Sequence, residues 1–192
     1  MHTLRNLGAF TLVELIFSIA ILAIVIALAA PSMSDLHRRH RNESTGRQLF
    51  DLISLGRGKA YGHGQVYTLC PSKDGQSCGD DWGRGAMLFV DSDSSGERAA
   101  TEKIERVMPA LPAGASLQWR SFSPKTFLQF RPDGLTNNQN GNFAYCPPNG
   151  KASHGWIIVL NATGRPYYGR DSDGDGIVET GSGKNLACGS VI

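Results

Sequence analysis

A long apolar run near the N-terminus places the strongest constraint on this chain. Residues 10–30 are almost wholly apolar and follow a nine-residue polar leader that contains Arg5. About 20 such residues suffice for a helix to cross a bilayer. One carboxylate, Glu14, lies inside the run, and Pro31 follows it. Because a charge within a membrane span is costly and usually functional, the run predicts a membrane helix in which Glu14 needs a partner.

Two simpler interpretations explain only part of this pattern. A secretory signal peptide would be cut after the run, where "ALAAPS" offers small residues, but the run is long for such a peptide and contains Glu14. A plain membrane anchor explains the length and gives Glu14 no role. Neither interpretation accounts for the carboxylate and the proline together.

The segment "FTLVEL", after a small residue and a short charged leader, resembles the class III signal of type IV pilins and pseudopilins. The resemblance implies that a prepilin peptidase cuts between Ala9 and Phe10 and that the new N-terminus is methylated. Counted from Phe10, Glu14 is fifth and Pro31 twenty-second, where this family usually has a glutamate and a helix-bending proline. Ala9 departs from the usual glycine, but a cut after Gly8 would put both positions out of frame.

The resemblance also implies what Glu14 does. In an assembled fibre the apolar helices pack together, and the glutamate meets the N-terminal amine of a neighbouring subunit. A carboxylate in apolar surroundings must be paired or neutralised. The pairing therefore favours one register of insertion, and Glu14 and Pro31 are the expected assembly residues.

The rest of the chain predicts one helix followed by strands. An intermittent apolar pattern continues the helix to about Lys59, and we expect it to be weakened at Gly46 and frayed by Gly56 and Gly58. From Val66 onward, short strand candidates alternate with glycine-rich turns. We therefore expect an α+β, pilin-like fold, with a long N-terminal α-helix packed on an antiparallel β-sheet domain. Its predicted parts are a leader (1–9), a transmembrane half-helix (10–31), an amphipathic half-helix (32–60) and a periplasmic or extracellular β domain (61–192).

The β region resembles the FimT/FimU and GspH branch of minor pilins and pseudopilins. It carries, in that family's order, "VYTLC", "WGRGAMLFVDSDSSG", "LQFRPDGLTNNQNGNFAYC" and "IIVLNATGRPYYG". The resemblance implies a minor pilin of a type IV pilus that helps initiate or cap the fibre, with twitching, adhesion or DNA uptake as its contexts. A GspH-like minor pseudopilin of a type II secretion system and a DNA-binding pilus-tip receptor are the alternatives.

This class implies a location, a set of partners and no enzymatic activity. We expect a single-pass protein of the bacterial inner membrane with its C-terminal domain in the periplasm, which later enters a pilus or pseudopilus fibre. The expected partners are other pilin subunits, prepilin peptidase and the membrane. The sequence contains no GxSxG, phosphate loop or HExxH, so no catalytic residue is assigned.

Four dispersed cysteines behind a membrane segment indicate disulfides in an oxidising compartment. No CxxC pair or histidine cluster accompanies them, which argues against a zinc site. Of the three possible pairings we favour Cys70–Cys78, which closes a small loop, together with Cys146–Cys188, which ties the C-terminal tail to a strand.

Calcium is the one cofactor that the sequence suggests. In "DSDGDGIVE", Asp171, Asp173 and Asp175 have the spacing of the first half of an EF-hand loop. Ser182 occupies the place of the bidentate glutamate, so Glu179 has to substitute. A solvated turn rich in Asp, Ser and Gly explains this loop equally well.

A second acidic loop, "DSDSSGERAATE", fits a calcium-binding pattern less well. Asp91, Asp93 and Glu102 fit the pattern, but Arg98 stands where an apolar residue is expected. For this loop we favour an ordinary polar turn.

DNA binding is a more specific functional hypothesis than calcium binding. Some FimT-like minor pilins take up DNA through a basic Gly-Arg-x-Arg stretch, and "GRPYYGR" matches it in part. Arg165 is present, Tyr167 replaces the second arginine, and Arg170 follows. The two tyrosines between the arginines offer stacking surfaces for bases. A formal net charge of only +2 gives no general attraction for nucleic acid, so an ordinary strand end is the favoured interpretation.

Overall fold

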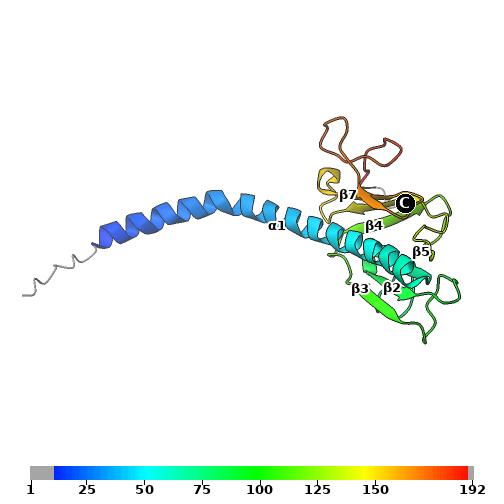
Figure 1. Cartoon of the computed structure of the whole chain (residues 1–192). Coiled ribbons are helices and arrows are strands. Elements are labelled where there is room, and N and C mark those ends of the chain that lie inside the picture. The colour runs from blue at the N-terminus through cyan, green and yellow to red at the C-terminus, as the bar shows by residue number, and fades with distance from the viewer. Residues whose placement is uncertain (1–10, 190–192) are drawn as a thin grey trace, which may run out of the picture. The chain divides into compact units, whose positions relative to one another are not determined.

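The structure is a computed structural model that describes residues 11–189, without the side chains of residues 28–32, 34–35 and 38. The predicted cleavage site, Ala9 and Phe10, therefore lies outside the described residues. The chain divides into two compact units, residues 1–41 and 42–192. Helix α1 (Leu12–His63) begins in the first unit and ends in the second (Figure 1). It ends at His63, four residues later than predicted, and the next residue, Gly64, has a positive φ of 63°, the left-handed conformation common after a helix.

The described part of the first unit is helical, and over residues 12–26 its surface is mainly apolar. Its large aliphatic and aromatic side chains between residues 12 and 26 are each more than half exposed, from 56% at Leu15 to 73% at Leu12. None of the helices in residues 11–189 combines the length and the apolarity that a membrane crossing demands. The transmembrane half-helix stays a prediction.

The second unit contains two antiparallel sheets. The first has the strand order β3-β2-β1-β5 and the second β4-β6-β7-β8 (Figure 1). Sheet one consists of β1 (Tyr67–Pro71), β2 (Ala86–Val90), β3 (Ile104–Met108) and β5 (Leu128–Phe130). Sheet two consists of β4 (Ser116–Ser121), β6 (Gly141–Cys146), β7 (Trp156–Leu160) and β8 (Pro166–Tyr168). Two short 3₁₀ helices, Trp82–Arg84 and Ala152–His154, interrupt the loops. The predicted α+β fold is confirmed.

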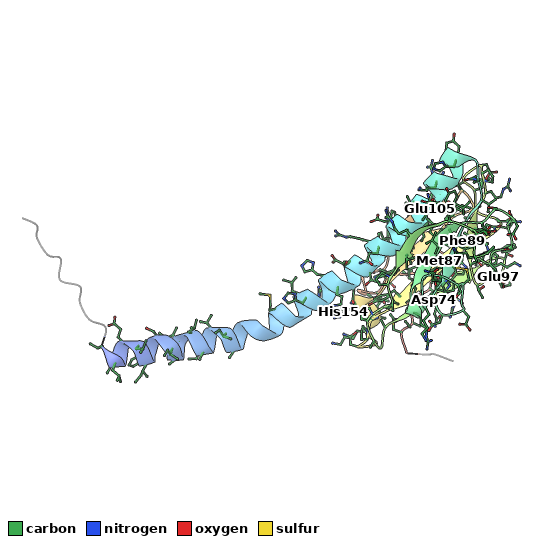
Figure 2. The ribbon with its side chains drawn as sticks, turned by 90° about the horizontal axis from the view of Figure 1, so that it is seen from below. Asp74, Met87, Phe89, Glu97, Glu105 and His154 are labelled. Atoms are coloured by element: carbon green, nitrogen blue, oxygen red, sulfur yellow. A yellow bond between two sulfur atoms is a disulfide. The ribbon has the colours of Figure 1, made fainter. Side chains whose placement is uncertain are left out.

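The C-terminal half of α1 packs on both sheets through one face. Leu49, Leu52, Ile53 and Ala60 recur at helical spacing and share a buried cluster with residues of both sheets. On β2, Ala86 and Leu88 join this cluster. Met87 and Phe89, labelled in Figure 2, alternate with them and pack in a second cluster.

Helix α1 continues through Gly46, Gly56 and Gly58 to His63, and Gly46 and Gly56 lie where it contacts the sheets closely. A Cβ on Gly56 would lie 2.9 Å from Leu88 Cδ1, and one on Gly46 would lie 3.1 Å from Trp156 Cε2. The missing side chains let the helix backbone approach the sheets closely. Glycine at these two positions lowers the intrinsic stability of the helix, but it allows denser packing between the helix and the sheets.

Polar contacts fix the helix against each sheet. The Lys59 ammonium donates to Glu105 on β3 at 2.6 Å, and its hydrogen bond, with that from Lys103, lowers the pKa of the Glu105 carboxyl. At sheet two, Asn42 Oδ1 accepts from the Tyr145 hydroxyl at 3.0 Å, and its backbone carbonyl accepts from Trp156 Nε1 at 2.9 Å. Both aromatic donors are buried, so each finds the partner that burial requires.

The structure has the two disulfides that the sequence favoured. Cys70 is bonded to Cys78 and Cys146 to Cys188, at sequence separations of 8 and 42 residues. In a chain-entropy account, loops of these sizes stabilise the fold by about 2.5 and about 4 kcal/mol. The second bond attaches the C-terminal segment to the end of β6.

Candidate functional site

The N-terminal apolar helix, residues 12–27, is the first candidate site. It begins with a local cap, since the Glu14 amide donates to Thr11 Oγ1 at 3.3 Å. One turn on, the Ser18 hydroxyl donates to the Glu14 carbonyl at 2.7 Å. Both contacts use main-chain atoms of Glu14 and leave its carboxylate exposed.

Within the part of the chain that the structure describes, the Glu14 carboxylate has no cation in an ion pair with it. In water this costs nothing, but covering the helix with lipid or protein would leave a charge in an apolar medium. The arrangement therefore demands an external cation or a proton whenever the apolar surface is covered.

The loop of residues 171–179 brings together three of its four predicted calcium ligands. Asp171, Asp173 and Glu179 each offer one oxygen, and these oxygens lie within 4.8 Å of one another. Asp175 is not part of this group, and its carboxylate accepts from the Ile177 amide and from Asn185 Nδ2.

The same oxygens also hold the loop. Asp171 accepts from the amides of Gly174 and Gly176, and Glu179 accepts from the Ser172 amide at 2.9 Å. These are bonds of an ordinary polar turn. Calcium at this loop stays a prediction, which a calorimetric titration at millimolar calcium would test.

In the second acidic loop, residues 91–102, the carboxylates accept hydrogen bonds that stabilise the loop. Oxygens of Asp91, Asp93 and Glu102 also lie within 4.8 Å of one another. Asp91 is fully buried, however, and accepts from the Thr68 hydroxyl, the Gln129 amide group and two loop amides. Hydrogen bonds from Ser95 lower the pKa of the exposed Asp93. This geometry supports the polar-turn interpretation.

Tyr167, Tyr168 and Arg170 line one cavity beside β8, and the acidic residue Glu179 lines it as well. The Tyr168 ring stacks on Phe50 of α1, with ring centres 5.3 Å apart, and burial raises its pKa. One face of that ring is therefore already occupied, while Tyr167 is 49% exposed. Arg165 and Arg170 are exposed on either side of the strand. DNA binding at these residues stays a prediction.

Two family models match the chain. The model described as "Type II transport protein GspH" matches residues 45–164, and the "Prokaryotic N-terminal methylation motif" matches residues 4–30. The second range contains Ala9, Phe10 and Glu14, so the sequence signal that we inferred is present. No match to the chain is found among curated proteins.

Solved structures of similar fold include two minor pilin crystal forms and a pseudopilin. The type IV minor pilin FimU of Pseudomonas aeruginosa aligns with a TM-score of 0.55 and 22% identity, over 69% of this chain and 90% of FimU. A second FimU crystal form gives a TM-score of 0.52 at 22% identity, over 67% and 92% of the two chains. The minor pseudopilin EpsH of the Vibrio cholerae type 2 secretion system aligns with a TM-score of 0.49 and 12% identity, over 67% and 95%.

The two family models identify the family of the chain, and the similarity to FimU shows that it shares the fold of that protein. The GspH model covers more than half of the chain, and the methylation motif covers the apolar run that carries Glu14. At 22% identity, FimU shows that the helix and the two sheets are arranged as in a minor pilin. The chain belongs to the GspH family and is a structural subunit of the type IV minor pilin and pseudopilin class.

Proposed function

We propose that the chain is a minor pilin of a type IV pilus and helps to initiate or cap the fibre. Assembly into a fibre is supported by the N-terminal apolar helix, which is exposed in the single chain and contains one carboxylate. The likeness of the fold to FimU, a type IV minor pilin, favours the pilus. Apolar surface of this extent needs a cover. Before assembly this surface is buried in the lipid of the inner membrane. Within the fibre it is buried against the helices of neighbouring subunits.

Processing prepares this helix for assembly. Prepilin peptidase cuts between Ala9 and Phe10, and the new N-terminus is a methylated amine. A neighbouring subunit presents that amine to Glu14 and so supplies a cation for its carboxylate. Pro31 removes one backbone hydrogen bond and loosens the helix beyond the apolar run.

A GspH-like minor pseudopilin of a type II secretion system is the second candidate function. The match of the GspH family model to residues 45–164 favours it. The same apolar helix and the same use of Glu14 serve both functions. The difference is whether the fibre extends from the cell surface or stays in the periplasm.

Cell fractionation separates the two functions. Surface fibres are sheared from cells, and the chain is quantified by mass spectrometry in the sheared fibres and in the inner membrane. The major fibre subunit serves as the positive control, and an inner-membrane enzyme serves as the control for contamination. A pilus subunit is expected as a trace component of the sheared fibres. Recovery in the membrane fraction alone would contradict the pilus function and favour the pseudopilin.

A further inference from the structure

Strands β4 and β6 of the second sheet carry a polar face that points away from the core. Beside it on β7 the same side is apolar, and Ile157 and Val159 pack there with Leu186. In the register of β4 and β6, Gln118 pairs with Ala144 and Arg120 with Asn142. Side chains alternate along a strand, so these four lie on one face. The intervening residues Leu117, Phe143 and Tyr145 are buried in the core on the other face.

The C-terminal segment covers this polar face and makes a cleft. After β8 the chain folds back on itself, with the Leu186 amide donating to the Val178 carbonyl and the Thr180 amide to the Lys184 carbonyl. The Cys146–Cys188 disulfide holds the end of this segment at β6. Between the face and residues 180–187 lies the C-terminal cleft, a space of about 440 Å³. In Figure 1 the segment after β8 forms the loops coloured orange to red.

The C-terminal cleft is positively charged. Arg120 and Lys184 both line it, and no carboxylate is among its lining residues. Neither cation belongs to an ion pair in the part of the chain that the structure describes. Asp175 accepts a hydrogen bond from Asn185 but does not line the cleft. Two like charges beside one cleft repel each other, so an anion between them is favoured.

The remaining lining residues indicate what kind of anion fits. Besides the apolar Ala144, Leu186 and Ala187, the cleft is lined by the amides of Gln118, Asn142 and Asn185 and the hydroxyls of Thr180 and Ser182. Some of these groups already bond within the chain: Gln118 Oε1 accepts from Arg120, the two hydroxyls bond each other, and Asn185 Nδ2 donates to Asp175. Each still has a further donor or acceptor for a ligand. Neutral hydrogen-bonding groups therefore outnumber the two cations. The volume lies within the range of small-molecule sites, about 300–1,000 Å³. A ligand with one carboxylate and several hydroxyls matches this set.

The same features disfavour a nucleic-acid strand. Single-stranded nucleic acid is typically held in a groove of cations that follows its backbone, with aromatic rings that stack on the bases. The C-terminal cleft has two cations and no aromatic lining residue. We propose that it binds a carboxylated sugar unit of the uronic acid type, with the carboxylate between Arg120 and Lys184 and the hydroxyls on the neutral side chains.

The test is a titration of the full chain with small sugars. The protein is held in micelles of a polyoxyethylene detergent, which has no sugar head group, and titrated with methyl glucuronide by calorimetry. We expect a dissociation constant on the order of 1 mM and binding of methyl glucoside weaker by about tenfold or more. Arg120→Gln and Lys184→Gln are each expected to weaken glucuronide binding about tenfold. The matched control is Lys151→Gln, an exposed cation outside the cleft, which should bind normally.

Several results would overturn the proposal. These are the absence of glucuronide binding, equal binding of the neutral glucoside, or normal binding in both cleft variants. Inorganic phosphate and a short single-stranded oligonucleotide are titrated as well. If either binds more tightly than the glucuronide, and the binding depends on Arg120, the ligand of the cleft is that kind of anion and the sugar proposal is contradicted. The titration does not involve Glu14 or fibre assembly, so this proposal and the proposed function fail independently.

Discussion

Replacing Glu14 with alanine is expected to reduce incorporation into fibres by about 100-fold or more. Breaking a buried ion pair by removing one partner costs about 3–5 kcal/mol, and each 1.4 kcal/mol is a factor of ten. In the variant, the neighbouring N-terminal amine would enter an apolar fibre core without its carboxylate. Membrane insertion should not suffer, because the variant makes the apolar run more apolar.

Two matched variants make the Glu14 experiment specific. Glu14→Gln keeps the size and polarity of the side chain and removes only its charge, so it should be nearly as defective as the alanine variant. Ser18→Ala lies one turn away on the same exposed helix and should assemble normally. Incorporation is measured as the ratio of protein in sheared fibres to protein in the membrane. Normal incorporation of Glu14→Ala would show that assembly does not need the pair.

Replacing Asp91 with alanine is expected to lower the free energy of unfolding by about 3 kcal/mol, because buried donors lose their acceptor. Thr68 and Gln129 are both buried and donate to the Asp91 carboxylate at 2.6 and 2.8 Å. Two amides of the following turn, from Ser95 and Gly96, donate to the same carboxylate at 3.0 Å. The variant removes the acceptor at the centre of this network.

The neighbouring Asp93 provides the control. It is exposed and shares the Ser95 amide with Asp91, so Asp93→Ala is expected to cost less than about 1 kcal/mol. Asp91→Asn should stay close to the alanine variant, because its amide group turns a donor toward other donors. Chemical unfolding followed by circular dichroism measures all three variants. A loss below 1 kcal/mol for Asp91→Ala would mean that water replaces the carboxylate without penalty.

The sequence predicted the parts of this protein that depend on local pattern. Apolar residues at helical spacing predicted the C-terminal half of α1, and alternating runs between turns predicted the strands. The pilin signal depends on consecutive residues around Phe10, so a single sequence suffices to find it. The disulfide pairing also followed from spacing and from the expected position of the tail.

Features that depend on tertiary contacts could not be predicted in this way. Gly46 and Gly56 were interpreted through helix propensity, although their role is set by Trp156 and Leu88 on distant strands. Asp91 looked like a candidate ligand, and only the fold shows Thr68 and Gln129 beside it. The C-terminal cleft combines three segments that are far apart in the sequence, and no motif marks any of them.

Mass spectrometry of the N-terminal peptide tests the central claim most directly. The chain is purified from fibres or from the membrane, digested and examined for its first peptide. A processed fibre subunit must begin at Phe10 with a methylated amine, because only that register makes Glu14 the fifth residue. A chain that still begins at Met1 would have no amine at the required place, and the proposed pairing between subunits would be contradicted.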